Sequence, residues 1–201
     1  MVDLAEGEVL SWELADGRPF MLYGGPPLAS GILSLTSNTP APPVETVINV
    51  TDETTLDHAR EGQTYNVDAG GRLPYRFTAG FGSRVNFIGG NSLFGLSALA
   101  GSEVVVSSGT VETTIYSHAR SRVSIGGGTL SGLSVETGGM GEMTDGELQS
   151  ARVQGQLRIE GGEVGLIYTY GGGEVELTGG TVDILQLGYN STGTLVGSQF
   201  T

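Results

Sequence analysis

The chain has 201 residues, of which 35 are Gly and none is Cys, and it carries a formal net charge of −13. The absence of Cys excludes disulfides, thiolate metal sites and thiol nucleophiles. All nine basic residues are Arg, and the acidic excess argues against binding to nucleic acid or to anionic membranes, because both need basic groups that neutralise phosphate. No window approaches the roughly 18 apolar residues of a membrane span, so no membrane insertion is expected.

Residues 1–38 differ in pattern from the rest of the chain and predict a small N-terminal β unit. Two apolar-rich segments, Val9–Leu14 and Pro19–Tyr23, flank Ala15–Arg18, and Asp-Gly between such segments is a hairpin signal. A third segment, Gly31–Thr36, alternates with period two and predicts another strand. We expect this unit to serve as a cap or as a contact between chains.

A Pro-rich linker is predicted at residues 39–43, because Pro favours an extended chain and cannot donate to a strand ladder. From residue 44 to residue 201 the pattern apolar-x-apolar-x-Gly-Gly-x-apolar recurs, most clearly in Leu157–Val164 and Val175–Val182. Copies of the pattern, some of them degraded, start at residues 48, 65, 85, 104, 123, 141, 157, 175 and 193. These starts lie 16 to 20 residues apart, so we expect about nine coils with a period near 18.

Each coil holds three short apolar segments. In one coil they are Val123 and Ile125, then Leu130, then Leu133 and Val135. Two apolar residues separated by one residue form the inward face of a short strand. Such segments bury their apolar faces when coils stack on one another. The prediction is an all-β fold, a single-stranded parallel β-helix over residues 44–201. A period of 18 also suits a left-handed β-helix of hexapeptides, but the missing strict hexapeptide pattern and the variable coil length favour a right-handed one.

The densest acidic cluster spans three successive coils and is a candidate metal site. Ca²⁺ takes six to eight oxygen ligands, and a solenoid can bring carboxylates together at the spacing of its coils. The candidate ligands are Glu142, Glu147, Glu160, Glu163, Glu174 and Glu176. Most of them occupy outward positions, where a solvated charged face is the alternative. No other cofactor is expected.

A second set of side chains alternates along one stretch and is a candidate ligand site. Its members are Tyr116, His118, Arg120 and Arg122. The alternation predicts one shared face, on which an Arg could take a proton from a uronate; a coil corner with solvated groups is the alternative. A further three residues, Tyr168, Tyr170 and Tyr189, predict either a sugar-stacking strip or ordinary surface Tyr. No catalytic residue is assigned, because no nucleophile motif occurs.

Residues 123–130, VSIGGGTL, and 175–182, VELTGGTV, resemble the V-x-I-x-G-G-T-V coils of secreted bacterial parallel β-helix repeat proteins. These include uncharacterised surface proteins of aquatic bacteria and are similar to autotransporter passenger repeats. The resemblance covers roughly residues 44–201 and implies an architecture rather than an activity. Residues 14–20, LADGRPF, resemble a segment that in such proteins usually follows a run of coils. Here the segment precedes the coils, which departs from that order. The departure would be explained if the chain were one unit of a longer tandem array.

The regular coil pattern favours a non-enzymatic, extracellular or cell-surface protein with a structural or adhesive role. Because the first residues do not resemble a signal peptide, this location implies a fragment or a processed chain. Head-to-tail self-association into fibres or a surface layer is expected, since the last coil, ending at Gln199–Thr201, offers unpaired strand edges. The alternatives are a polysaccharide-binding or polysaccharide-lyase-like β-helix that acts on acidic glycans, and a phage-type fibre.

Overall fold

The computed structural model describes residues 9–13, 19–23, 46–92 and 95–197, with the backbone alone described in the first two ranges. Strands β1 (Val9–Glu13) and β2 (Pro19–Tyr23) pair in antiparallel fashion, as the hairpin signal predicts. The strand predicted at residues 31–36 and the linker predicted at residues 39–43 lie outside the described residues. The division of the chain into these units therefore stays a prediction.

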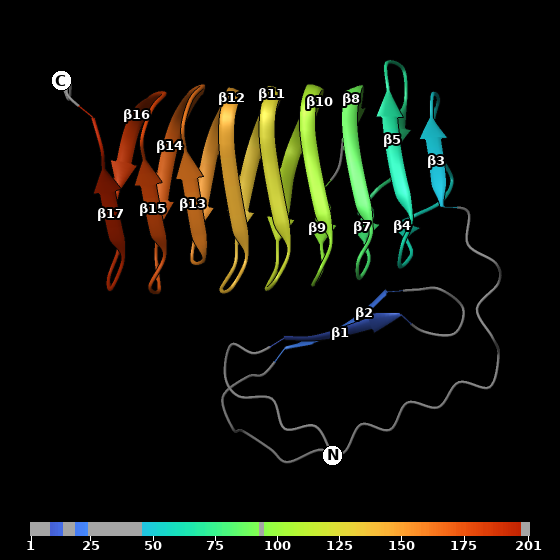
Figure 1. Cartoon of the computed structure of the whole chain (residues 1–201), viewed down its shortest axis with the longest axis horizontal. Coiled ribbons are helices and arrows are strands. Elements are labelled where there is room, and N and C mark those ends of the chain that lie inside the picture. The colour runs from blue at the N-terminus through green and yellow to red at the C-terminus, as the bar shows by residue number, and fades with distance from the viewer. Residues whose placement is uncertain (1–8, 14–18, 24–45, 93–94, 198–201) are drawn as a thin grey trace, which may run out of the picture.

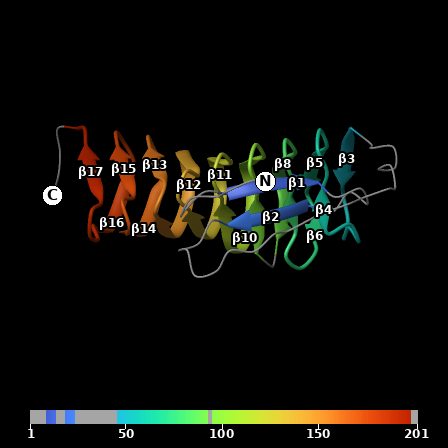
Figure 2. The ribbon, with the colours of Figure 1, turned by 90° about the horizontal axis from the view of Figure 1, so that it is seen from below.

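From residue 46 onward the described residues form a parallel β-solenoid without helices, and its turns lie side by side along one axis (Figures 1 and 2). Nine strands stack in parallel on its first face: β3 (Val47–Val50), β5 (Thr64–Asp68), β8 (Arg84–Ser92), β10 (Glu103–Ser117), β11 (Arg122–Val135), β12 (Met140–Val153), β13 (Gln156–Ile159), β15 (Glu174–Leu177) and β17 (Thr192–Leu195). Paired residues in adjacent strands are 16 to 20 residues apart in the sequence. The smallest separation is that of Met140 and Gln156, and the largest is that of Thr64 and Arg84. Nine strands thus delimit about eight turns.

The predicted coil starts are confirmed, because all nine fall in one column of paired residues. In chain order this column contains Ile48, Tyr65, Val85, Val104, Val123, Gly141, Leu157, Val175 and Gly193. At Gly141 the missing side chain leaves space that Leu157 and Leu133 fill. The fold is therefore the predicted parallel β-helix, while its hand stays a prediction.

Each complete turn has two more faces. A short second face pairs residues such as Thr110 with Thr129 and Val111 with Leu130. The third face contains the last segments of β10, β11 and β12 together with β9 (Leu96–Ala98), β14 (Glu163–Thr169) and β16 (Thr181–Gln186). Strands β14 and β16 begin on the second face and continue onto the third. The short strands β4 (His58–Ala59), β6 (Arg72–Leu73) and β7 (Thr78–Ala79) complete the first turns.

Glycines form a corner column between the first and second faces. Gly109, Gly128 and Gly146 have φ angles of 97°, 77° and 98°, a region that L side chains rarely adopt. A Cβ atom on Gly128 would lie 2.6 Å from the carbonyl oxygen of Gly109, and one on Gly146 would lie 2.8 Å from that of Gly128. Each corner therefore needs Gly for its backbone conformation and for the close approach of the preceding turn.

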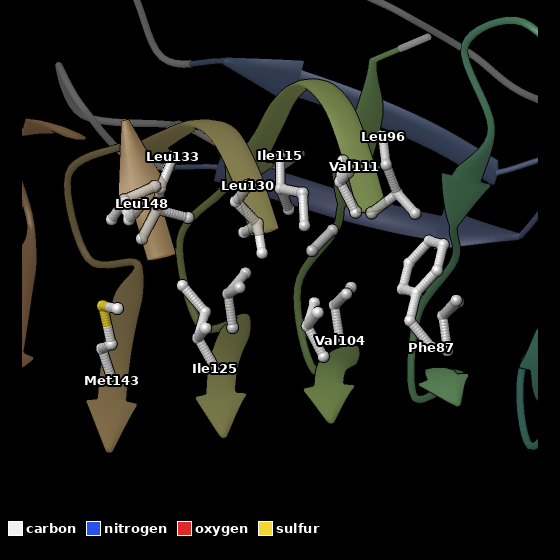
Figure 3. Packing of buried hydrophobic residues seen from close by; sticks show 14 of the residues in the cluster. Phe87, Leu96, Val104, Val111, Ile115, Ile125, Leu130, Leu133, Met143 and Leu148 are labelled. Carbon is white, nitrogen blue, oxygen red and sulfur yellow. The ribbon is translucent and has the colours of Figure 1, made fainter. Parts of the chain in front are cut away.

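The core is a stack of apolar side chains that repeats from turn to turn (Figure 3). Val111, Leu130 and Leu148 are register partners in successive turns, and each is fully buried. Burying a side chain of this size contributes roughly 1.5–3 kcal/mol. In the last described turn Leu185 is half-buried and Leu187 is 48% exposed, because a neighbouring turn covers them on one side only among the described residues.

Two glycines in the same turn test the corner requirement. Gly128→Ala should lower the free energy of unfolding by about 1–3 kcal/mol, because Ala is strained at positive φ. Gly126→Ala is the matched control: its Cβ atom would lie no closer than 3.7 Å to a neighbour, so it should be neutral or stabilise by up to about 1 kcal/mol. Urea denaturation followed by circular dichroism compares the two, and equal losses would contradict the requirement.

Candidate functional site

Arginines pair with three of the six glutamates predicted to bind Ca²⁺. Glu142 and Glu176 flank Arg158 in one outward column. Arg158 lies 3.5 Å from the carboxylate of Glu176 and 3.0 Å from that of Glu160, and Glu142 forms an ion pair with Arg122. These carboxylates therefore belong to a ladder of alternating charge, which stabilises neighbouring strands.

The other three glutamates lie apart from this ladder. Glu174 accepts a hydrogen bond of 3.0 Å from the side-chain amide of Gln156, whereas Glu147 and Glu163 are neighbours on the second face. Within the ranges that the structure describes, no three His, Cys, Asp or Glu side chains gather closely enough to hold a metal ion. The structure thus brings some of the six candidates side by side, as with Glu147 and Glu163, but gathers no three of them into one site.

The predicted ligand set is divided by a corner. The rings of Tyr116 and His118 lie together, with centroids 6.3 Å apart and planes 13° apart. Arg120 occupies the following turn with a φ of 63°, and its N–H donates to the Gly138 carbonyl over 2.7 Å. Arg122 begins β11 on the first face. Tyr116 and His118 are therefore brought together, whereas Arg122 pairs with Glu142 on the first face and Arg120 is exposed at the corner.

A column of register partners that alternate with inward residues runs along the third face from turn to turn, and in it Ser134 is only 5% exposed. Its members, in register, are Ser97, Tyr116, Ser134, Arg152, Tyr168 and Gln186. An open groove of about 600 Å³ follows part of this column and is lined by Ser150, Ala151, Arg152, Leu166, Tyr168, Tyr170 and Gln186. The neighbouring residues Tyr116, His118, Ser134 and Glu136 do not line this hollow but continue its surface toward the earlier turns. We call the hollow and this continuation together the aromatic groove and define it as Tyr116, His118, Ser134, Glu136, Arg152, Tyr168, Tyr170 and Gln186.

Two tyrosines form the aromatic wall of the groove. Tyr168 and Tyr170 flank the buried Thr169, so strand alternation places both rings on the outer surface. Their centroids are 6.0 Å apart and their planes are 17° apart. Tyr168 is 38% exposed, whereas Tyr170 is half-buried. The pair therefore offers an ordered, partly exposed aromatic surface.

A polar cluster joins this wall to the turns before it. The Ser134 hydroxyl donates to Glu136 Oε1 over 2.7 Å, and the charge of Glu136 acts on Tyr170, which lies two turns after Ser134. Burial raises the pKa of Tyr170 above its ordinary value of 10, the charge of Glu136 adds to this shift, and the Ser134 side chain and Arg152 oppose it. Tyr170 is therefore a neutral phenol at neutral pH.

His118 contributes a neutral imidazole to the other end of the groove. The side chain is buried, and this burial lowers its pKa below the ordinary value of 6.5, while the charge of Glu136 acts in the opposite direction. The neutral form is thus the dominant one at pH 7. Glu136 and Arg152 then carry the formal charges of the groove, and they balance.

Sequence reasoning missed Ser134, Glu136 and Arg152. The register held a usable signal for Arg152, because it follows inward Ala151 just as Tyr168 follows inward Ile167. Tyr189, predicted as part of a strip with Tyr168 and Tyr170, is 85% exposed and does not line the groove.

A second groove, of about 380 Å³, lies on the first face. Its lining includes Gln156, Arg158, Glu174 and Glu176, whose side chains hydrogen-bond or pair with one another. No aromatic side chain lines it. The aromatic groove is therefore the stronger candidate for a binding site.

Comparison with known proteins finds no matching protein-family model, curated protein or solved structure. The coarse content of the resemblance, a parallel β-solenoid built from repeated turns, is confirmed by the fold. A kinship with secreted bacterial repeat proteins stays a prediction. Across the residues described, no helix has the length and apolar character needed to cross a membrane.

The burial of His118 predicts that stability falls as the pH is lowered from about 7.5 to about 5.5. The unfolded chain takes up a proton near the ordinary pKa of 6.5, whereas folded His118 resists protonation until a lower pH. The unfolded state then binds more protons, so acid favours unfolding. His118→Gln should reduce this pH dependence, as measured by urea midpoints across the window. An unchanged pH dependence in the variant would contradict the assignment.

Proposed function

We propose that the protein is an adhesive β-solenoid that binds a polysaccharide chain in its aromatic groove. The observation that carries the proposal is the pair of parallel rings, Tyr168 and Tyr170, beside Arg152 in an open groove. The electron-rich face of an aromatic ring attracts the C–H groups on the apolar face of a sugar. Ligand sites typically combine such apolar walls with a few polar groups that fix orientation.

The chemistry of the groove favours holding a glycan over cleaving it. Glycoside hydrolysis ordinarily needs two carboxyl groups on opposite sides of the scissile bond, and Glu136 is the one carboxylate among the residues that define the groove. Arg120 and Arg122, predicted as possible proton acceptors for a lyase, lie outside it, and Arg122 is paired with Glu142. The extracellular location, the phage-type fibre and the lyase-like activity stay predictions.

Replacement of one wall residue tests the proposal. Tyr168→Ala should weaken binding to polysaccharide by roughly tenfold, about 1.4 kcal/mol, because an aromatic contact with the bound chain is lost. Affinity electrophoresis in gels that contain xylan, glucomannan, soluble cellulose derivatives or pectate measures the effect. Tyr75→Ala is the matched control, since Tyr75 is 58% exposed and lies outside the groove. Retardation by none of the polymers, or equal losses in both variants, would contradict the proposal.

Head-to-tail self-association is a second proposal, favoured by apolar side chains at both ends of the described solenoid. Leu195 in β17 is 47% exposed and the inward Ile48 in β3 is half-buried, and both strands present an unpaired edge within the described residues. Parallel stacking of one copy's last turn on the next copy's first turn would cover these groups and continue the ladder.

A matched pair of substitutions tests this association. Leu195→Glu should abolish any concentration-dependent increase in sedimentation coefficient, because it places a charge in the proposed contact. Met140→Glu, at a position that is 48% exposed on the side of the rod, should leave the increase unchanged. A wild-type protein that stays monomeric at high concentration would contradict the proposal.

A further inference from the structure

We infer that the aromatic groove binds an uncharged, extended pyranose polymer that lies along the solenoid axis, with about one sugar over each turn. This inference rests on the proposed function, because it names the class of glycan for the same groove. It departs from the sequence-based expectation of acidic glycans. The spacing of the turns, the charge balance of the groove and its hydrogen-bonding groups carry it.

The spacing of the turns matches that of an extended sugar chain. Five register partners, Tyr116, Ser134, Arg152, Tyr168 and Gln186, occupy five successive turns. Neighbouring strands lie about 4.8 Å apart, so the column spans roughly 19 Å. A pyranose chain with equatorial linkages advances by about one ring length per sugar, which is close to this spacing. A chain laid along the axis therefore meets one register position at every turn, of which all but the buried Ser134 are exposed.

The aromatic residues lie where such a chain would need them. Tyr116 and Tyr168 belong to the same column and are separated by three turns. Each has a second ring beside it, one residue past the end of its own strand, His118 and Tyr170 respectively. The chain would thus meet the exposed ring of Tyr116 at one end of a short polar stretch and that of Tyr168 at the other. A chain that ran across the strands would leave this column after one or two sugars.

The charge balance favours a neutral polymer. Within the groove Glu136 and Arg152 offset each other, while the whole protein carries a net charge of −13. A uronate or sulfated chain would approach against this charge and would find one Arg in the groove. It would also lie close to the Glu136 carboxylate. A neutral chain is repelled neither by the net charge of the protein nor by the Glu136 carboxylate.

The polar groups of the groove suit sugar hydroxyls, which both donate and accept hydrogen bonds. The carboxylate of Glu136 accepts, the guanidinium of Arg152 donates, and the amide of Gln186 does both. Ser134 already donates to Glu136 over 2.7 Å, so the carboxylate is held in place before a ligand arrives. A preorganised acceptor loses little entropy on binding.

The test compares neutral and anionic oligosaccharides of matched length by isothermal titration calorimetry on the whole chain. Neutral β-1,4-linked glucose, xylose and mannose oligomers of roughly two to six sugars should bind more tightly with length up to about five sugars, the number of turns in the column. Oligogalacturonates of equal length should bind at least about tenfold more weakly at low salt. Tighter binding of the anionic series, or affinity that stops rising at two sugars, would overturn the inference.

Glu136→Gln separates this inference from the proposed function. The substitution keeps the shape and an acceptor for Ser134 but removes the negative charge, so the relative affinity for oligogalacturonate should rise several-fold. Glu163→Gln, an exposed glutamate on the second face, is the control and should change neither affinity. Preferential anion binding that Tyr168→Ala abolishes would overturn the inference and leave the proposed function standing. Binding of no oligosaccharide and no polymer would overturn both.

Discussion

Each turn of the solenoid must satisfy its backbone hydrogen bonds with the turns before and after it, because short strands have no other partners for these groups. The N–H groups of Arg84, Glu103 and Arg122 donate to carbonyls of the preceding turn over 2.8 to 3.1 Å. This ladder fixes the distance between turns and keeps equivalent residues in columns. The corner glycines follow from the same constraint, since the carbonyl of one corner lies against the Cα atom of the next.

The columns also give the molecule its candidate function. On the first face the constraint aligns Glu142, Arg158 and Glu176, whose charges alternate and pair with one another. On the third face the same constraint aligns Tyr116 with Tyr168 and places Arg152 between them. On the first face the charged side chains therefore pair with one another, whereas the third face presents rings and hydrogen-bonding groups to solvent. That difference is the physical basis of the proposed glycan site.

The coil starts could be predicted because the Gly corners and the apolar pairs recur locally, even where, as at Gly141, the inward side chain is missing. The face that the alternation predicts for Tyr116 and Arg122 does not form, and the coil corner named as the alternative takes its place. Arg120 adopts a left-handed corner with a φ of 63° where neighbouring turns have Gly101 and Gly138, so no Gly marked the bend. The electrostatic influence of Glu136 on both His118 and Tyr170 was also beyond the sequence, since it depends on how side chains from different turns lie relative to one another. Register is encoded in the repeat, whereas side-chain direction along the axis is not.

The most direct test of the account is a titration of the isotopically labelled protein with a neutral oligosaccharide of about five sugars, the number of turns that the column spans, followed by amide chemical shifts. The account predicts shifts confined to the third face from β10 to β16, with the amides of Tyr116, Arg152 and Tyr168 among those affected. The Arg158 ladder on the first face should stay unchanged. Shifts centred on that ladder, or no shifts on the third face at saturating ligand, would contradict the account.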